Sequence, residues 1–75
     1  MDKKAYKEEC KKMEYSALLI ESLSLKETIG RLNDFLKEKE NAHQVNDILS
    51  MYDMLNEIVE CKEKLRIVED ERKSR

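Results

Sequence analysis

The sequence predicts an all-α protein, an antiparallel helical hairpin that assembles into a four-helix-type bundle or coiled coil. The chain of 75 residues has no Pro and a single Gly, so it lacks the residues that punctuate strands and tight turns. Ala, Leu, Glu, Lys and Met, which favour helices, are abundant. Apolar residues also recur at alternating spacings of three and four, which is the period of a helix packed on a neighbour.

The first helix is expected over about residues 3–40. Asp2 is placed to cap its N-terminus, because an Asp oxygen can accept from free N–H groups of the first turn. A heptad seam with one Ser follows and passes through Ser24 without a slip. The members of this seam are Tyr15, Leu18, Ser22, Leu25, Ile29, Leu32 and Leu36.

The segment Ser24-Leu25-Lys26-Glu27 offers an alternative. It matches a capping box, in which the Ser and the Glu three residues later satisfy each other's backbone N–H groups. A helix starting there would give a three-helix bundle with a break at Ser24. Such a bundle would depend less on a partner chain. The unbroken seam favours one continuous helix whose apolar face changes near residue 18.

The second helix is expected over about residues 44–72, after the only clear break in the pattern, at residues 37–47. A second capping-box candidate, Asn41 to Gln44, indicates a turn near residues 41–44. Residues 72–75 are expected to fray. The whole chain, 1–75, is then a single helical domain, consistent with its length.

Two apolar rows run along this second helix, about 120° apart at 100° per residue. One row is Val45, Ile48, Tyr52, Leu55 and Val59; the other is Met51, Met54, Ile58, Cys61, Leu65 and Val68. A helix that packs on one neighbour needs only one row, so two rows predict two neighbours.

Folding back near residue 42 leaves the residues before Tyr15 overhanging, without a partner in the same chain. We therefore expect a non-enzymatic interaction module, a small helical subunit, adaptor or inhibitor that binds protein. It would form a homo-oligomer or join a hetero-complex. The predicted partner-binding residues are Tyr6, Cys10, Met13, Ala17, Ile20, Met51, Met54, Ile58, Cys61, Leu65 and Val68.

Residue types for catalysis, cofactors or metals do not gather in any known pattern. His43, the only His, falls in the expected turn, and Cys10 and Cys61 lack metal-ligand spacing. Both the hairpin and the three-helix alternative keep these cysteines too far apart for a disulfide. We expect no catalytic, cofactor or metal site and no enzyme activity.

Charges indicate a solvated helical surface. The net charge is −2 with 43% charged residues of both signs, which makes nucleic-acid binding unlikely. The longest apolar run, Ala17 to Ile20, is too short for a membrane span, so we expect a soluble, intracellular protein. Favourably spaced ion pairs are Glu8–Lys12, Glu27–Arg31, Glu60–Lys64 and Glu69–Lys73.

Residues 48–59, ILSMYDMLNEIV, look a little like the second helix of small bacillar phosphatases that act on sporulation response regulators. Of that family's signature only Leu55 matches, so the activity is not carried over. A similar likeness of residues 25–36 and 45–55 to short subunits of the fungal DASH kinetochore ring consists mostly of helical spacing. No family is assigned. A regulator of a signalling protein, acting through Asp53 or Asn56 on a phosphatase-like hairpin, remains the alternative function.

Overall fold

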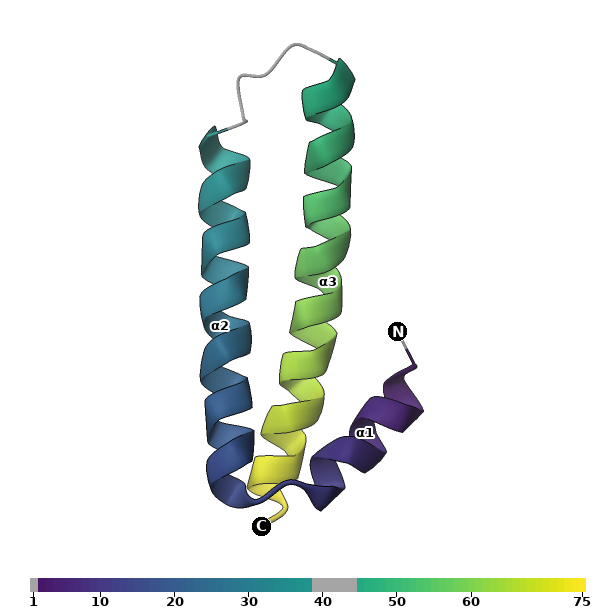
Figure 1. Cartoon of the computed structure of the whole chain (residues 1–75), viewed down its shortest axis with the longest axis vertical. Coiled ribbons are helices and arrows are strands. Elements are labelled where there is room, and N and C mark those ends of the chain that lie inside the picture. Colours follow the sequence, from purple (N-terminus) through teal and green to yellow (C-terminus); the bar gives the residue numbers. More distant parts are fainter. Residues whose placement is uncertain (1, 39–44) are drawn as a thin grey trace.

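A computed structural model describes residues 2–38 and 45–75, and this part of the chain forms three α-helices. They are α1 (Lys3–Lys12), α2 (Tyr15–Glu38) and α3 (Val45–Lys73). Helices α2 and α3 lie side by side and run in opposite directions, and α1 turns back beside the C-terminal part of α3 (Figure 1). The prediction of an all-α protein is confirmed.

Helix α1 begins as the sequence predicts. The carboxylate of Asp2 accepts hydrogen bonds from the backbone N–H groups of Lys4, at 3.0 Å, and Ala5, at 3.1 Å. These two groups would otherwise lack a partner in the first turn, where no preceding carbonyl is available. Asp2 thus sets the start of α1 by a purely local interaction.

The first helix is not continuous, so the expectation of one helix over about residues 3–40 is wrong. Helix α1 ends at Lys12, and Met13 has an extended backbone, with φ −77° and ψ 145°. Neither Gly nor Pro marks this break. Its physical reason is burial: turning the chain here places Tyr6, Cys10 and Met13 against α3 instead of leaving them in water. The expected overhang before Tyr15 is therefore also wrong.

The alternative break at Ser24 is wrong as well, because Ser24 lies within α2. The hydroxyl of Thr28 donates to the Ser24 carbonyl at 3.0 Å, one helical turn apart. Glu27 pairs with Arg31 and does not reach back to cap a new helix. Of the heptad seam, Leu18, Ser22 and Leu25 are buried, and the later members Ile29, Leu32 and Leu36 are half-buried. Tyr15, its first member, is 52% exposed.

The core gathers where all three helices meet. Cys10 of α1, Leu18 and Leu25 of α2, and Val68 of α3 form one buried cluster. Ile58 is buried further along α3, at 5% exposure. Fully burying an aliphatic side chain of this size contributes about 1.5–3 kcal/mol. Docking of α1 therefore extends the core beyond what α2 and α3 alone would bury.

Some sequence predictions lie outside the described residues. These are the turn near 41–44, the capping-box candidate from Asn41 to Gln44, and His43. At the other end, residues 72–75 were expected to fray, but α3 continues to Lys73 and both Arg72 and Arg75 make side-chain contacts with α1, α2 or α3. Among the described helices, none is both long and apolar enough to span a bilayer.

Candidate interaction surface

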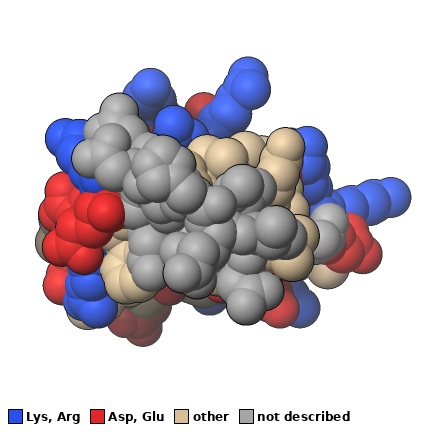
Figure 2. Space-filling view, turned by 90° about the horizontal axis from the view of Figure 1, so that it is seen from above, with Lys and Arg blue, Asp and Glu red and all other residues tan. Residues whose placement is uncertain are grey.

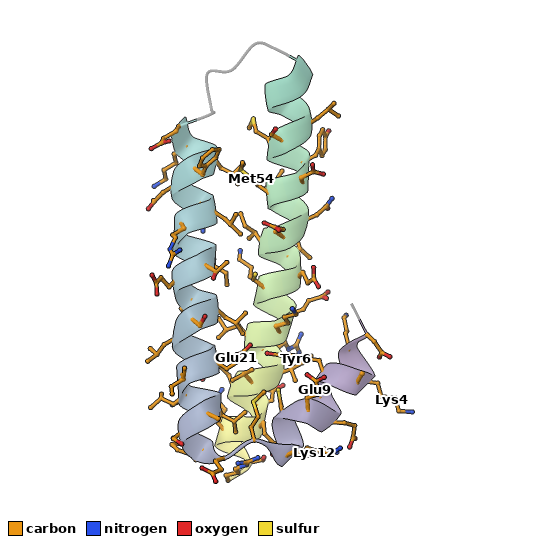
Figure 3. All side chains as sticks on the ribbon, in the orientation of Figure 1. Lys4, Tyr6, Glu9, Lys12, Glu21 and Met54 are labelled. Carbon is orange, nitrogen blue, oxygen red and sulfur yellow. The ribbon has the colours of Figure 1, made fainter. Side chains whose placement is uncertain are left out.

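One of the two apolar rows of α3 faces the other helices. Ile58 and Val68 are buried, at 5% and 0% exposure. Met54 points toward α2 (Figure 3), and Met51, Met54, Cys61 and Leu65 are half-buried. We call these six residues the inner row. All were predicted to bind a partner, but the structure places them between helices of the same chain.

The remaining predicted partner-binding residues divide at the break after α1. Tyr6, Cys10 and Met13 pack in the cluster where the helices meet. Ala17 and Ile20, which share their spacing in the sequence, are exposed on α2. The break at Met13 interrupts the helical repeat of three and four residues. Ala17 and Ile20 therefore do not lie on the same face as the apolar residues of α1.

Four large apolar side chains are exposed on α3, and we call them the outer patch. They are Leu49 at 58%, Tyr52 at 63%, Leu55 at 46% and Val59 at 56% exposure. They span about 15 Å along the helix, at 1.5 Å per residue. Three of them, Tyr52, Leu55 and Val59, belong to the row that starts at Val45 in the sequence. Helix α3 therefore packs the inner row inside the chain and presents these members of the other row to solvent.

A smaller exposed apolar group lies on α2. Leu19, Ile20 and Leu23 are 38%, 67% and 57% exposed. Because α2 and α3 are antiparallel (Figure 1), this group lies at the end where α3 finishes, away from the outer patch. The two apolar surfaces are therefore separate.

A polar cluster interrupts the seam between α2 and α3. Ser22 is fully buried, and its hydroxyl donates to the carboxylate of Glu69. Arg72 donates to both oxygens of the same carboxylate, at 2.9 and 3.2 Å, and lies over the Tyr15 ring at 5.7 Å. The hydrogen bond from Ser22, followed by the charge of Arg72, holds the pKa of Glu69 below its ordinary value despite opposing desolvation. A polar group in an apolar seam favours the one register in which it is satisfied, and here that register pairs Ser22 with Glu69.

Polar contacts also attach α1 to the rest of the chain. The Tyr6 hydroxyl donates to Glu21 of α2 at 2.9 Å, and the two side chains face each other in Figure 3. Lys64 lies over the Tyr6 ring at 5.6 Å, and Lys3 pairs with Glu63 at 3.2 Å. Burial, and then the hydrogen bond to Glu21, raise the pKa of Tyr6.

The far end of α1 is capped by Arg75. Its guanidinium donates to the backbone carbonyls of Cys10, at 3.1 Å, and Lys11, at 3.0 Å, and also to that of Met13. A carboxylate oxygen of Glu71 holds the same side chain at 3.2 Å. The Cys10 carbonyl also accepts from the backbone N–H of Met13, at 3.2 Å. The guanidinium therefore adds donors to the carbonyls at this end of α1, where the helix dipole favours a cation. Local sequence reasoning missed this contact, because the partners are more than 60 residues apart.

A shallow cleft of about 420 Å³ separates α1 from α3. Cationic side chains dominate its lining, and the end of the Lys4 side chain projects away from α3 in Figure 3. The lining residues are Lys3, Lys4, Lys7, Glu63, Arg66, Ile67 and Asp70. Within residues 2–38 and 45–75, no three His, Cys, Asp or Glu side chains are grouped to hold a metal ion.

The two cysteines are closer in the fold than the sequence suggested. Cys10 is buried in the core cluster and Cys61 packs against that cluster, and both are free thiols. Burial raises the pKa of each thiol, which disfavours the reactive thiolate. This environment suits small core side chains rather than nucleophiles.

Seen from the end where α3 begins, Lys, Arg, Asp and Glu side chains of both signs lie around the rim of the molecule (Figure 2). The predicted pairs Glu27–Arg31 and Glu60–Lys64 are present. The prediction of Glu8–Lys12 is wrong, because Glu8 pairs with Lys11 at 3.4 Å. Glu69 pairs with Arg72 in place of Lys73, because Ser22 draws its carboxylate toward the seam.

Comparison of the chain with protein-family models, curated proteins and solved structures finds no match. The outer patch is therefore assessed on its own chemistry.

Proposed function

We propose that this protein is a non-enzymatic protein–protein interaction module that docks the outer patch of α3 onto a partner or a second copy. The observation that carries this proposal is the exposure of four large apolar side chains, each 46–63% exposed, on one side of α3. Single exposed apolar residues are ordinary on protein surfaces, but contiguous ones typify interaction sites.

Tyr52 is the expected anchor of the contact. It is the most exposed member of the patch, at 63%. A tyrosine ring buries a large apolar area while its hydroxyl stays at the rim, and tyrosines are enriched among residues that dominate binding energies. Leu55 and Val59 follow Tyr52 at steps of three and four residues. This spacing suits a partner helix that lies along α3.

The patch alone supports only modest affinity. Complete burial of each side chain is worth about 1.5–3 kcal/mol, and roughly half of that area is already covered, so the patch adds about 3–6 kcal/mol. Lost translational and rotational freedom costs an estimated 4–15 kcal/mol. A stable complex therefore needs further contacts beside the patch.

Site-specific photo-crosslinking in cells that express the protein tests the proposal. A benzoylphenylalanine replaces Tyr52 or Val59, and the matched control replaces Ser24, an exposed polar residue of α2. We expect discrete adducts from positions 52 and 59, no adduct from position 24, and loss of the adducts in Leu55→Glu. Absence of adducts at both patch positions, or the same adducts from position 24, would contradict the proposed function.

A further inference from the structure

We propose that the outer patch and the basic residues below it form one surface for an amphipathic partner helix that is apolar in one half and acidic in the other. This inference rests on the proposed function and specifies the partner's chemistry. It starts from the way the exposed row of α3 changes character along its length.

The row keeps its helical spacing beyond the patch. From Tyr52 the steps of three and four residues continue through Lys62 and Arg66 to Lys73, so these side chains share one side of α3. The distance from Tyr52 to Lys73 is about 31 Å at 1.5 Å per residue. The members are, in order, Tyr52, Leu55, Val59, Lys62, Arg66, Glu69 and Lys73.

The second half of this row carries uncompensated positive charge. Lys62, Arg66 and Lys73, which we call the basic row, are exposed and form no ion pair within the described part of the chain. Neighbouring cations differ: Lys64 pairs with Glu60 at 3.9 Å. The basic row is therefore available to an acidic partner.

Glu69 does not neutralise the basic row. Its carboxylate turns toward the seam, where it accepts from buried Ser22 and from Arg72 and lies 3.9 Å from Lys26. On the cleft side, Glu63 pairs with Lys3 at 3.2 Å. Asp70 is the remaining acidic neighbour. It lines the cleft together with Arg66, but no ion pair joins Asp70 to a basic-row residue in the described part of the chain.

A second copy of the chain fits this surface poorly. In a parallel symmetric pair along α3, each basic row would face its own copy, which is repulsive. In an antiparallel pair, the basic row either faces the apolar patch or overhangs it. Duplex nucleic acid would match the cations but not the apolar half, and the chain's net charge of −2 opposes it.

Four fluorescein-labelled synthetic helical peptides of about 22 residues, the length of the row, test the partner's chemistry. Each carries Leu at three- and four-residue spacing in one half and either Glu or Lys at the same spacing in the other, in both orders. By fluorescence anisotropy, we expect a Glu peptide to bind about tenfold more tightly than its Lys counterpart, as several exposed ion pairs allow. The preference should decline with added salt.

Two triple variants locate the charge effect. Replacing Lys62, Arg66 and Lys73 by Gln should remove most of the preference for Glu. The matched control replaces Lys4, Lys7 and Lys12 of α1, which are also exposed, and changes the net charge by the same amount. We expect the control to keep the preference, and Leu55→Glu to abolish binding of both peptides.

Other outcomes would overturn the inference. Equal binding of Glu and Lys peptides, no peptide binding, or equal effects of the two triple variants would refute an acidic helix as the partner. A dimer of the protein alone that Leu55→Glu dissociates would assign the row to a second copy. Binding of a duplex DNA probe, lost in the basic-row variant while no peptide binds, would assign it to nucleic acid. Persistent crosslinks at positions 52 and 59 in any of these cases would show that the proposed function survives the failed inference.

Discussion

Substitution of Ile58 by Ala tests which side of α3 holds the fold together. Ile58 is 5% exposed, and Ile→Ala in a core costs about 2–5 kcal/mol from lost transfer energy and the cavity left behind. Around Ile58, half-buried Met54 and Cys61 can relax into the space, so we expect the lower part of that range, about 2–3 kcal/mol.

Leu55→Ala is the matched control on the same helix. Leu55 lies three residues away and is 46% exposed, so truncating it should cost no more than about 1 kcal/mol. Both changes introduce Ala, the strongest helix former. Any large difference between the two variants therefore reports packing and not helix propensity.

Urea unfolding followed by circular dichroism at 222 nm measures both variants. A chain of this size has a total stability of roughly 4–11 kcal/mol, so Ile58→Ala removes a large fraction. With a slope of about 1 kcal/mol per molar urea, its midpoint should fall by about 2 M, and that of Leu55→Ala by less than half as much. Equal shifts, or a larger shift for Leu55→Ala, would refute the assignment of inner row and outer patch.

Three further predictions concern the contacts around α1 and α2. Arg75→Ala removes the cap on α1, so alkylation of Cys10 by iodoacetamide, followed by mass spectrometry, should speed up several-fold; an unchanged rate would show that the cap does not hold α1. Ser22→Ala should lower the free energy of unfolding by about 1 kcal/mol at pH 7. Because the folded-state pKa of Glu69 is depressed, that loss should shrink in urea titrations as the pH falls below about 4, and a pH-independent loss would contradict it. Gly30→Ala should stabilise the protein by about 0.5–1 kcal/mol, since Gly30 is helical and a Cβ there meets no atom within 4 Å; a lower thermal midpoint would contradict this.

Features that depend on neighbouring residues were predictable from the sequence. The Asp2 cap needs only the N–H groups of the next turn, and it is present as expected. The seam through Ser22 depends on a repeat within one helix, which is also present. Continuity through Ser24 follows from the same repeat, because a capping box competes poorly with a buried seam on both sides.

Features that depend on distant residues were not predictable. The break at Met13 has no Gly or Pro, and its cause lies in the burial of α1 against α3. The cap by Arg75 joins residues more than 60 positions apart. In both cases the stabilising partner is distant in the sequence. The periodicity of the apolar residues therefore predicted a continuous first helix, whereas packing against α3 ends α1 at Lys12.

The choice between the two rows of α3 was open in the sequence because both have the same three- and four-residue spacing. One signal could have decided it. The row that contains the outer patch changes from apolar to charged between Val59 and Lys62, whereas the inner row stays apolar through Val68. The inner row is long enough to be covered by both α2 and α1. The other apolar row is shorter, because charged residues replace apolar ones from Lys62 onward.

The most direct test of the central claim, that α3 packs one apolar row inside and presents the other, is methyl NMR with a soluble gadolinium chelate. The chelate broadens methyl signals that solvent can approach. We predict strong broadening for Leu49, Leu55 and Val59, and protection for Ile58 and Val68. Protection of Leu55 and Val59 together with broadening of Ile58 would contradict the account.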